Sequence, residues 1–192
     1  MGKYLLNSKE IECKWQPTDN IKPVEMIKKR LAGNQVIIAY MRKSSNFNGY
    51  TVKPQIRAKV AGKIIKANGE VKVAKNGKGI SLVFECVRRD LNWETKFIDR
   101  MKLYKDFYDN FVQFDSGFQM PPQLIFVCED DKHTIEVFRE LVKNGITIDK
   151  IKYYFTTDLK QNSTSLEKSL IEFVQDENGK YKAKNVEIKL LG

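Results

Sequence analysis

One carboxylate stands inside an otherwise apolar run of this sequence. Glu85 lies within residues 80–87, Ile-Ser-Leu-Val-Phe-Glu-Cys-Val, which has the composition of a strand buried on both faces. Burying a charge is costly unless it is paired or binds a metal ion. Two oxygen ligands for Mg²⁺ or Mn²⁺ beside a cation are what metal-dependent cleavage of a phosphodiester requires. Neighbouring positions offer such groups, so the candidates are Glu85 and Asn68 as metal ligands, and Glu85, Glu70 and Lys96 as catalytic residues.

A structural role for Glu85 is the alternative. A buried carboxylate in a strand can also be held by a neighbouring cation, without any metal. The cations considered for that ion pair are Arg88, Arg57 and Lys96.

The positive charge of the chain is concentrated around the same carboxylate. Residues 1–114 carry a net charge of +12 and residues 115–192 carry −2, which together give the net charge of +10. Residues 53–89 contain ten basic residues and only two acidic ones, Glu70 and Glu85. Because like charges repel one another, such segregation predicts an anionic partner, for which phosphate backbone is the first choice and solubility alone the alternative. The predicted nucleic-acid-binding residues are Arg57, Lys59, Lys63, Lys66, Lys72, Arg88 and Arg89.

A second polar cluster, Glu129-Asp130-Asp131, directly follows an apolar run. It could bind a metal, but an aspartate that caps the next helix explains it more simply. His133, the only histidine, is predicted to be a surface residue at the start of that helix.

Length and composition favour a soluble intracellular protein. No apolar run approaches the roughly 18 residues of a membrane span, and the first residues lack a secretory signal. Cys13, Cys86 and Cys128 are too far apart for a local zinc site, and the last two lie in apolar runs. They are predicted to be buried thiols in a reducing compartment, which points to the cytoplasm.

Periodicity and turn residues predict the elements of the first half. A helix is expected from Asn20, with Pro23 in its first turn and Gly33 as its stop, followed by a strand over 35–42. Asn-Gly pairs at 68–69 and 76–77 predict two hairpin turns, the second leading into the strand over 80–87.

The second half alternates helices and strands. The expected elements are a helix over 93–111, a strand over 123–128, a helix over 131–143, a strand over 151–156, a short helix over 164–170 and a hairpin of 171–174 with 186–191. Hairpins followed by a β-helix-β crossover predict a mixed α/β fold, with a mixed central sheet flanked by helices. Residues 23–192 are expected to form one domain, with a basic half, 23–114, and a neutral half, 115–192; residues 1–22 form an N-terminal extension.

The stretch Phe84-Glu85-Cys86-Val87-Arg88-Arg89, followed by Trp93-Glu94-Thr95-Lys96 and a helix with Tyr104, resembles the replication-relaxation proteins of plasmids and mobile elements. The resemblance implies the restriction-endonuclease-like PD-(D/E)xK fold. There an Asp on one strand and Glu-x-Lys on the next bind metal. Asn68 stands in place of that Asp, Glu85 matches the Glu, and Val87 stands where the Lys belongs. Glu70 and Lys96 are possible substitutes.

Three functions follow as expectations. The first is a nucleic-acid-binding accessory protein of a plasmid or mobile element, binding DNA rather than RNA, on a nuclease-like fold with weak or no catalysis. The second is an active Mg²⁺- or Mn²⁺-dependent nuclease. The third is an interaction module that forms a homodimer through the exposed face of the aromatic helix 93–111; the aromatic residues themselves, at helical spacing, are more often part of a core.

Overall fold

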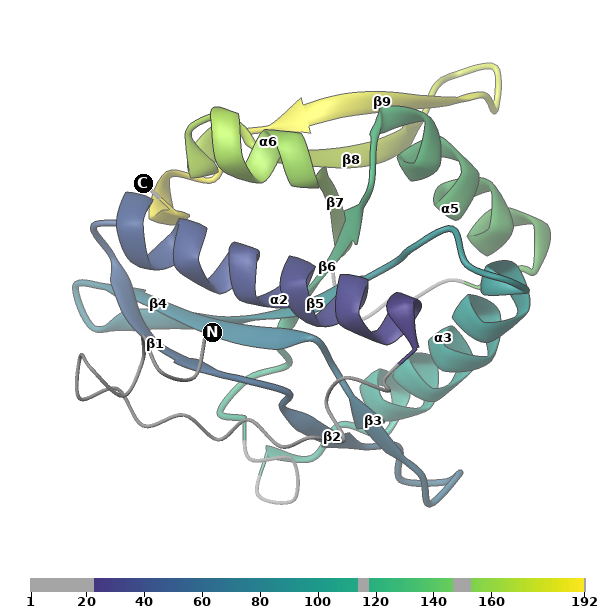
Figure 1. Cartoon of the computed structure of the whole chain (residues 1–192), viewed down its shortest axis with the longest axis horizontal. Helices are drawn as coiled ribbons and strands as arrows, with labels where there is room; N and C mark the ends of the chain where they lie inside the picture. Colours follow the sequence, from purple (N-terminus) through teal and green to yellow (C-terminus); the bar gives the residue numbers. More distant parts are fainter. Residues whose placement is uncertain (1–22, 114–117, 147–152, 192) are drawn as a thin grey trace.

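The computed structural model describes residues 23–113, 118–146 and 153–191, so the expected N-terminal extension and Cys13 lie outside the described residues. A seven-stranded mixed sheet forms the centre of the molecule, and helices pack on both of its faces (Figure 1). The strand order is β1-β4-β5-β6-β7-β8-β9. The predicted mixed α/β class is confirmed.

Helix α2 (Val24–Lys43) replaces two predicted elements. The helix does not stop at Gly33, and the strand expected over 35–42 is wrong. Val36, Ile37 and Tyr40 recur at helical spacing and pack on the sheet, so burial of this face outweighs the strand preference of β-branched residues. Gly33 lies inside α2. The helix passes so close to the main chain at Asn68 that a side chain at position 33 would strike the Asn68 carbonyl oxygen, so this position requires glycine.

Two Asn-Gly pairs have different outcomes. Asn76-Gly77, both at positive φ, forms the predicted hairpin turn between β4 (Gly69–Lys75) and β5 (Lys78–Cys86). Asn68-Gly69 forms no hairpin turn. Instead β4 pairs with β1 (Phe47–Thr51), and β3 (Ile64–Lys66) pairs with β2 (Gln55–Arg57) in a separate two-stranded sheet.

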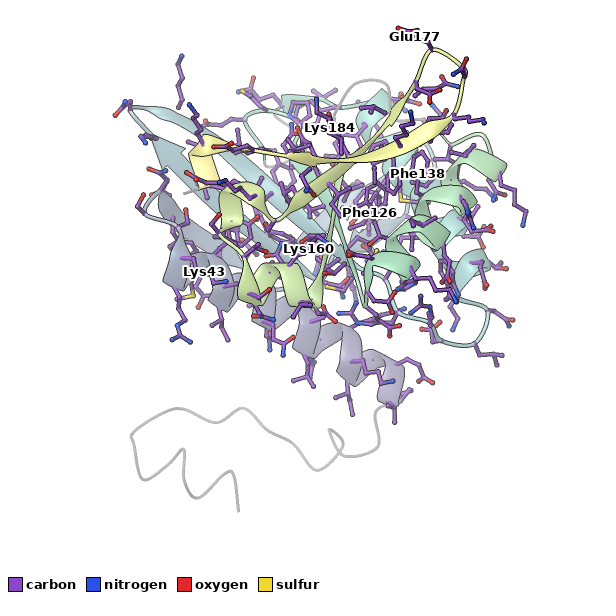
Figure 2. All side chains as sticks on the ribbon, turned by 90° about the horizontal axis from the view of Figure 1, so that it is seen from above. Lys43, Phe126, Phe138, Lys160, Glu177 and Lys184 are labelled. Carbon is purple, nitrogen blue, oxygen red and sulfur yellow. The ribbon has the colours of Figure 1, made fainter. Side chains whose placement is uncertain are left out.

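Strand β5 is central, as predicted, and is covered on both faces. It pairs antiparallel with β4 and parallel with β6 (Gln123–Cys128), which in turn pairs parallel with β7 (Tyr153–Thr157). Helices α3 (Trp93–Asp109) and α5 (Asp131–Lys143) make these crossovers and were both predicted. Val83 faces the core on the side of α3 and α5, while Phe84 faces the core under α2. Phe126 and Phe138 mark the first of these cores in Figure 2.

The aromatic residues of α3 lie in this core. Phe97, Tyr104, Phe107 and Tyr108 are all buried. The expectation that aromatic residues at this spacing belong to a core is confirmed for these four. Cys86 and Cys128 are buried free thiols, as predicted.

The C-terminal part differs in detail from the prediction. Helix α6 (Asp158–Ser163) starts earlier than the short helix expected over 164–170, which contains only a 3₁₀ turn, η2 (Leu166–Lys168). The terminal hairpin is formed by β8 (Leu170–Gln175) and β9 (Tyr181–Val186). Its second strand lies earlier than the expected 186–191, which contains a second 3₁₀ turn, η3 (Lys189–Leu191). Lys43 (labelled in Figure 2) ties α2 to α6 because its Nζ donates to the carbonyls of Gln161 and Asn162 at 2.8 and 2.6 Å. No helix among the described residues is both long and apolar enough to span a membrane.

Candidate nucleic-acid interface

A groove of about 660 Å³ lies beside the carboxyl end of β5. Its walls come from the end of β5, the first half of α3, β3 with the turn before it, and one residue of α2. A second hollow of about 570 Å³, lined by the start of α2 and by Val52 and Lys53, adjoins it. Five lining residues are common to both hollows: Lys29, Lys66, Asn68, Lys96 and Arg100. The two hollows therefore form one continuous depression, and the first is called the basic groove below.

Positive charge dominates the lining of the basic groove. Only Glu85 and Asp99 contribute carboxylates to it. The cationic lining residues are Lys29, Lys63, Lys66, Arg88, Lys96, Arg100 and Lys102. Lys63 and Lys66 are exposed, and neither has an ion-pair partner among the residues that the structure describes.

Glu85 is held by α3 at the floor of this groove. Its Oε1 lies 2.7 Å from Arg100 Nε, and its Oε2 accepts a hydrogen bond of 3.0 Å from the Tyr104 hydroxyl. Arg100 also donates to the carbonyl oxygen of Lys66. Burial, and next the Glu85 charge, raise the pKa of Tyr104 well above its ordinary value, so its hydroxyl remains a donor. An ion pair was one alternative for Glu85, but its partner is Arg100 rather than Arg88, Arg57 or Lys96.

The other predicted metal ligands are arranged differently. Asn68 lines the groove, but its Oδ1 accepts a hydrogen bond of 2.8 Å from the backbone N–H of Cys86. Glu70 is buried outside the groove lining, opposite Val83 in the β4–β5 register, with Lys72 Nζ 3.9 Å away. Across 23–113, 118–146 and 153–191, no three His, Cys, Asp or Glu side chains converge as a metal site would require.

Asp90 ties together two of the groove's lysines and was not identified from the sequence. Its buried carboxylate lies 3.0 Å from Lys29 Nζ on α2 and 3.4 Å from Lys96 Nζ on α3. Burial alone would raise the pKa of Asp90, but the two ammonium groups outweigh burial and lower it. Lys96, predicted to be a catalytic cation, is therefore paired with Asp90 rather than with Glu85.

The predicted nucleic-acid-binding residues do not form one surface. Lys63, Lys66 and Arg88 line the basic groove, but Arg88 is buried and paired with Asp158 at 2.8 Å. Arg57 and Lys59 line a separate hollow near the end of α3, and Lys72 lines another on the sheet. Arg89 points into an acidic cluster of Asp130, Glu136 and Glu129.

Three cations of the groove were missed in the sequence: Lys29, Arg100 and Lys102. Lys29 and the two α3 residues lie outside residues 53–89, where the local charge is most skewed. Arg100 could have been found, because Arg100 and Tyr104 are four residues apart and so share one face of α3. A cation on that face can reach the strand before the helix, where Glu85 is the carboxylate.

The cluster at residues 129–131 caps a helix, as favoured from the sequence. Asp130 Oδ1 accepts a hydrogen bond of 2.7 Å from the His133 backbone N–H at the start of α5. His133 was predicted to lie at the surface, and this is wrong. Its side chain is fully buried, with its ring edge-on to Trp93 at 5.0 Å, because α5 packs its first turn against α3.

Buried His133 gives the fold a pH dependence. Burial, with the Arg89 charge adding to it, lowers the pKa of His133 below 6.5. The unfolded chain thus takes up a proton before the folded protein does, so this contribution to stability is complete above about pH 6.5 and is lost as the pH falls. We expect the free energy of unfolding, measured in urea, to decrease between about pH 7 and 5 more in the wild type than in His133→Phe.

His133→Phe should be less stable at every pH because Nδ1 accepts a hydrogen bond from the Glu129 N–H, which phenylalanine cannot replace. The pH slope, rather than absolute stability, is therefore the informative quantity. Parallel slopes in the two proteins would show that His133 is not the group responsible.

We compared the chain with known family models, with curated proteins and with solved structures, and none of them matches it.

Proposed function

We propose that this protein binds the phosphate backbone of nucleic acid in the basic groove and does so without efficient cleavage. The main support for this proposal is the composition of the groove lining, which has seven cationic side chains and two carboxylates. Of these carboxylates, Glu85 is already paired with Arg100, and Asp99 lies 3.3 Å from Lys102. Asp90 pairs with Lys29 and Lys96, and Asp158 pairs with Arg88. Among the described residues, the positive charge of the lining that remains unpaired for phosphates is therefore that of Lys63 and Lys66.

We expect weak or no catalysis because the Glu85 and Asn68 oxygens that would bind a metal already contact other groups of the protein. A metal at Glu85 would have to displace Arg100 and the Tyr104 hydroxyl, and a metal at Asn68 would break its bond to the Cys86 backbone. Losing these contacts inside the protein would leave buried donors without partners. The site therefore supports binding better than metal-dependent hydrolysis.

DNA is the proposed nucleic acid, in an accessory role for a plasmid or mobile element. The element order α2, β1, β4, β5, α3 and β6 supports this, because a helix, a three-stranded meander, a helix and a strand is the order in the family that the sequence resembles. The two-stranded β2–β3 sheet would then be an insertion into the meander.

Salt dependence of binding tests the proposal. Fluorescence anisotropy with labelled single-stranded DNA, duplex DNA and RNA of about 20 nucleotides should give an affinity for DNA that falls steeply with NaCl, with a log-log slope of about −3 to −5. No binding at low salt, or an affinity independent of salt, would exclude the groove as a phosphate site. Stronger binding to RNA would contradict the choice of DNA. Plasmid nicking that requires Mn²⁺ and disappears in Glu85→Ala would contradict the absence of catalysis.

A further inference from the structure

Helix α2 is apolar on two opposite sides. One side packs on the sheet through Val36, Ile37 and Tyr40. The other side carries five large apolar residues, called the outer stripe, whose exposed fractions range from 38% to 63%: Val24, Ile27, Leu31, Ile38 and Met41. No other helix or strand of the described residues covers this side in Figure 1, and α2 forms one edge of the molecule in the turned view of Figure 2.

The spacing of the outer stripe is that of a helix-packing seam. Its residues follow one another by three, four, seven and three positions, so they occupy the a and d positions of consecutive heptads, and Asn34 takes the remaining d position. An apolar stripe at this spacing is normally buried against another element. Spacing of this kind matches another helix better than a strand or an irregular loop.

Charge identifies the kind of helix that fits. Lys28 and Arg42 border the stripe on one side and Arg30 borders it on the other, and none of the three has an ion-pair partner among the described residues. The other two cations of α2 are already used, since Lys29 pairs with Asp90 and Lys43 donates to carbonyls of α6. The stripe is thus an apolar seam with basic borders.

We propose that the outer stripe docks an amphipathic helix of another protein, one that carries acidic residues beside its apolar face. A second copy of this chain fits less well. In an antiparallel pair of α2 helices, Arg30 would face its own copy and Lys28 would face Arg42, and like charges at such positions oppose pairing. Arg30 and Asn34 also line the second hollow, so the stripe adjoins the basic groove, but its five apolar residues line neither hollow. The proposal goes beyond the proposed function because the partner is a protein helix rather than nucleic acid.

A synthetic peptide serves as the probe. It consists of three heptads with leucine at a and d, glutamate at e and g, and alanine elsewhere; the glutamates prevent the peptide from pairing with itself at neutral pH. Anisotropy of the labelled peptide with the full chain should show saturable binding. The double variant Leu31→Gln/Ile38→Gln should weaken binding at least about tenfold, because it removes two central anchors. Both residues are exposed, so circular dichroism should show an unchanged fold.

Three controls separate the stripe from other sites. A peptide of the same charge with alanine for leucine should not bind, and one with lysine for glutamate should bind at least about tenfold more weakly. The variant Lys63→Glu/Lys66→Glu, in the basic groove, should bind the first peptide unchanged. A failure of nucleic-acid binding would leave these results intact, so the two proposals fail independently.

Defined outcomes overturn the proposal. Absence of peptide binding would overturn it, as would equal binding by Leu31→Gln/Ile38→Gln. Sedimentation that shows a dimer of the wild type and a monomer of that variant would assign the stripe to a second copy of the chain instead.

Discussion

Replacing Glu85 by alanine is expected to lower the free energy of unfolding by about 2 kcal/mol, because the Glu85 carboxylate and the Tyr104 hydroxyl are buried while the Arg100 side chain is 31% exposed. The variant leaves the Arg100 guanidinium and the buried Tyr104 hydroxyl without their shared acceptor. A buried hydroxyl without a partner is costly, which is why the loss should exceed that of a surface pair. Urea unfolding followed by Trp93 fluorescence measures it.

Asp99→Ala is the matched control for this measurement. Asp99 lines the same groove and pairs with Lys102 at 3.3 Å, but both side chains are about two-thirds exposed. Its removal should change stability by less than about 0.5 kcal/mol. If Glu85 were instead an unpaired metal ligand, Glu85→Ala would stabilise the metal-free protein, and Mn²⁺ would raise the Tm of the wild type alone. That result would contradict the structural role of Glu85.

Reversing the charge of Lys63 and Lys66 is expected to weaken nucleic-acid binding at least about thirtyfold near 0.1 M salt and to reduce the log-log salt slope by about 2, or one per lost phosphate contact. Both lysines are exposed and line the basic groove. Because they do not support the core, Lys63→Glu/Lys66→Glu should unfold at the wild-type urea concentration. Anisotropy at several salt concentrations gives both quantities.

The control is Lys180→Glu/Lys184→Glu, which makes the same change in net charge at a site outside the basic groove. Lys180 and Lys184 are exposed on the terminal hairpin, where Figure 2 labels Lys184 on β9. We expect this variant to lose less than about threefold in affinity, since only the long-range field changes. Equal losses in the two double variants would mean that net charge attracts nucleic acid and that the groove is not the site.

The predictions from sequence were most accurate where one local rule acts alone. Continuous apolar runs correctly predicted β5 and β6, aromatic residues at helical spacing predicted α3, and Asn76-Gly77 predicted its hairpin turn. Each of these patterns depends only on residues that are neighbours in the chain. Errors arose where a distant contact outweighs a local preference. The residues after Gly33 have strand-like composition but are helical, because one face of that helix is buried on the sheet. Asn68-Gly69 forms no hairpin turn, because both residues pair with Phe84 of β5.

For the candidate site, the sequence by itself determined that residues 53–89 carry an excess of positive charge and that Glu85 lies in an apolar strand, since both properties follow from residue types along one stretch of chain. Only the tertiary structure decided the partners. It brings Arg100 and Tyr104 to Glu85 from α3, brings Lys29 to Asp90 from α2, and turns Arg89 away toward α5. Ion pairs depend on distances of a few ångströms between elements far apart in sequence, and packing of the helices on the sheet sets those distances.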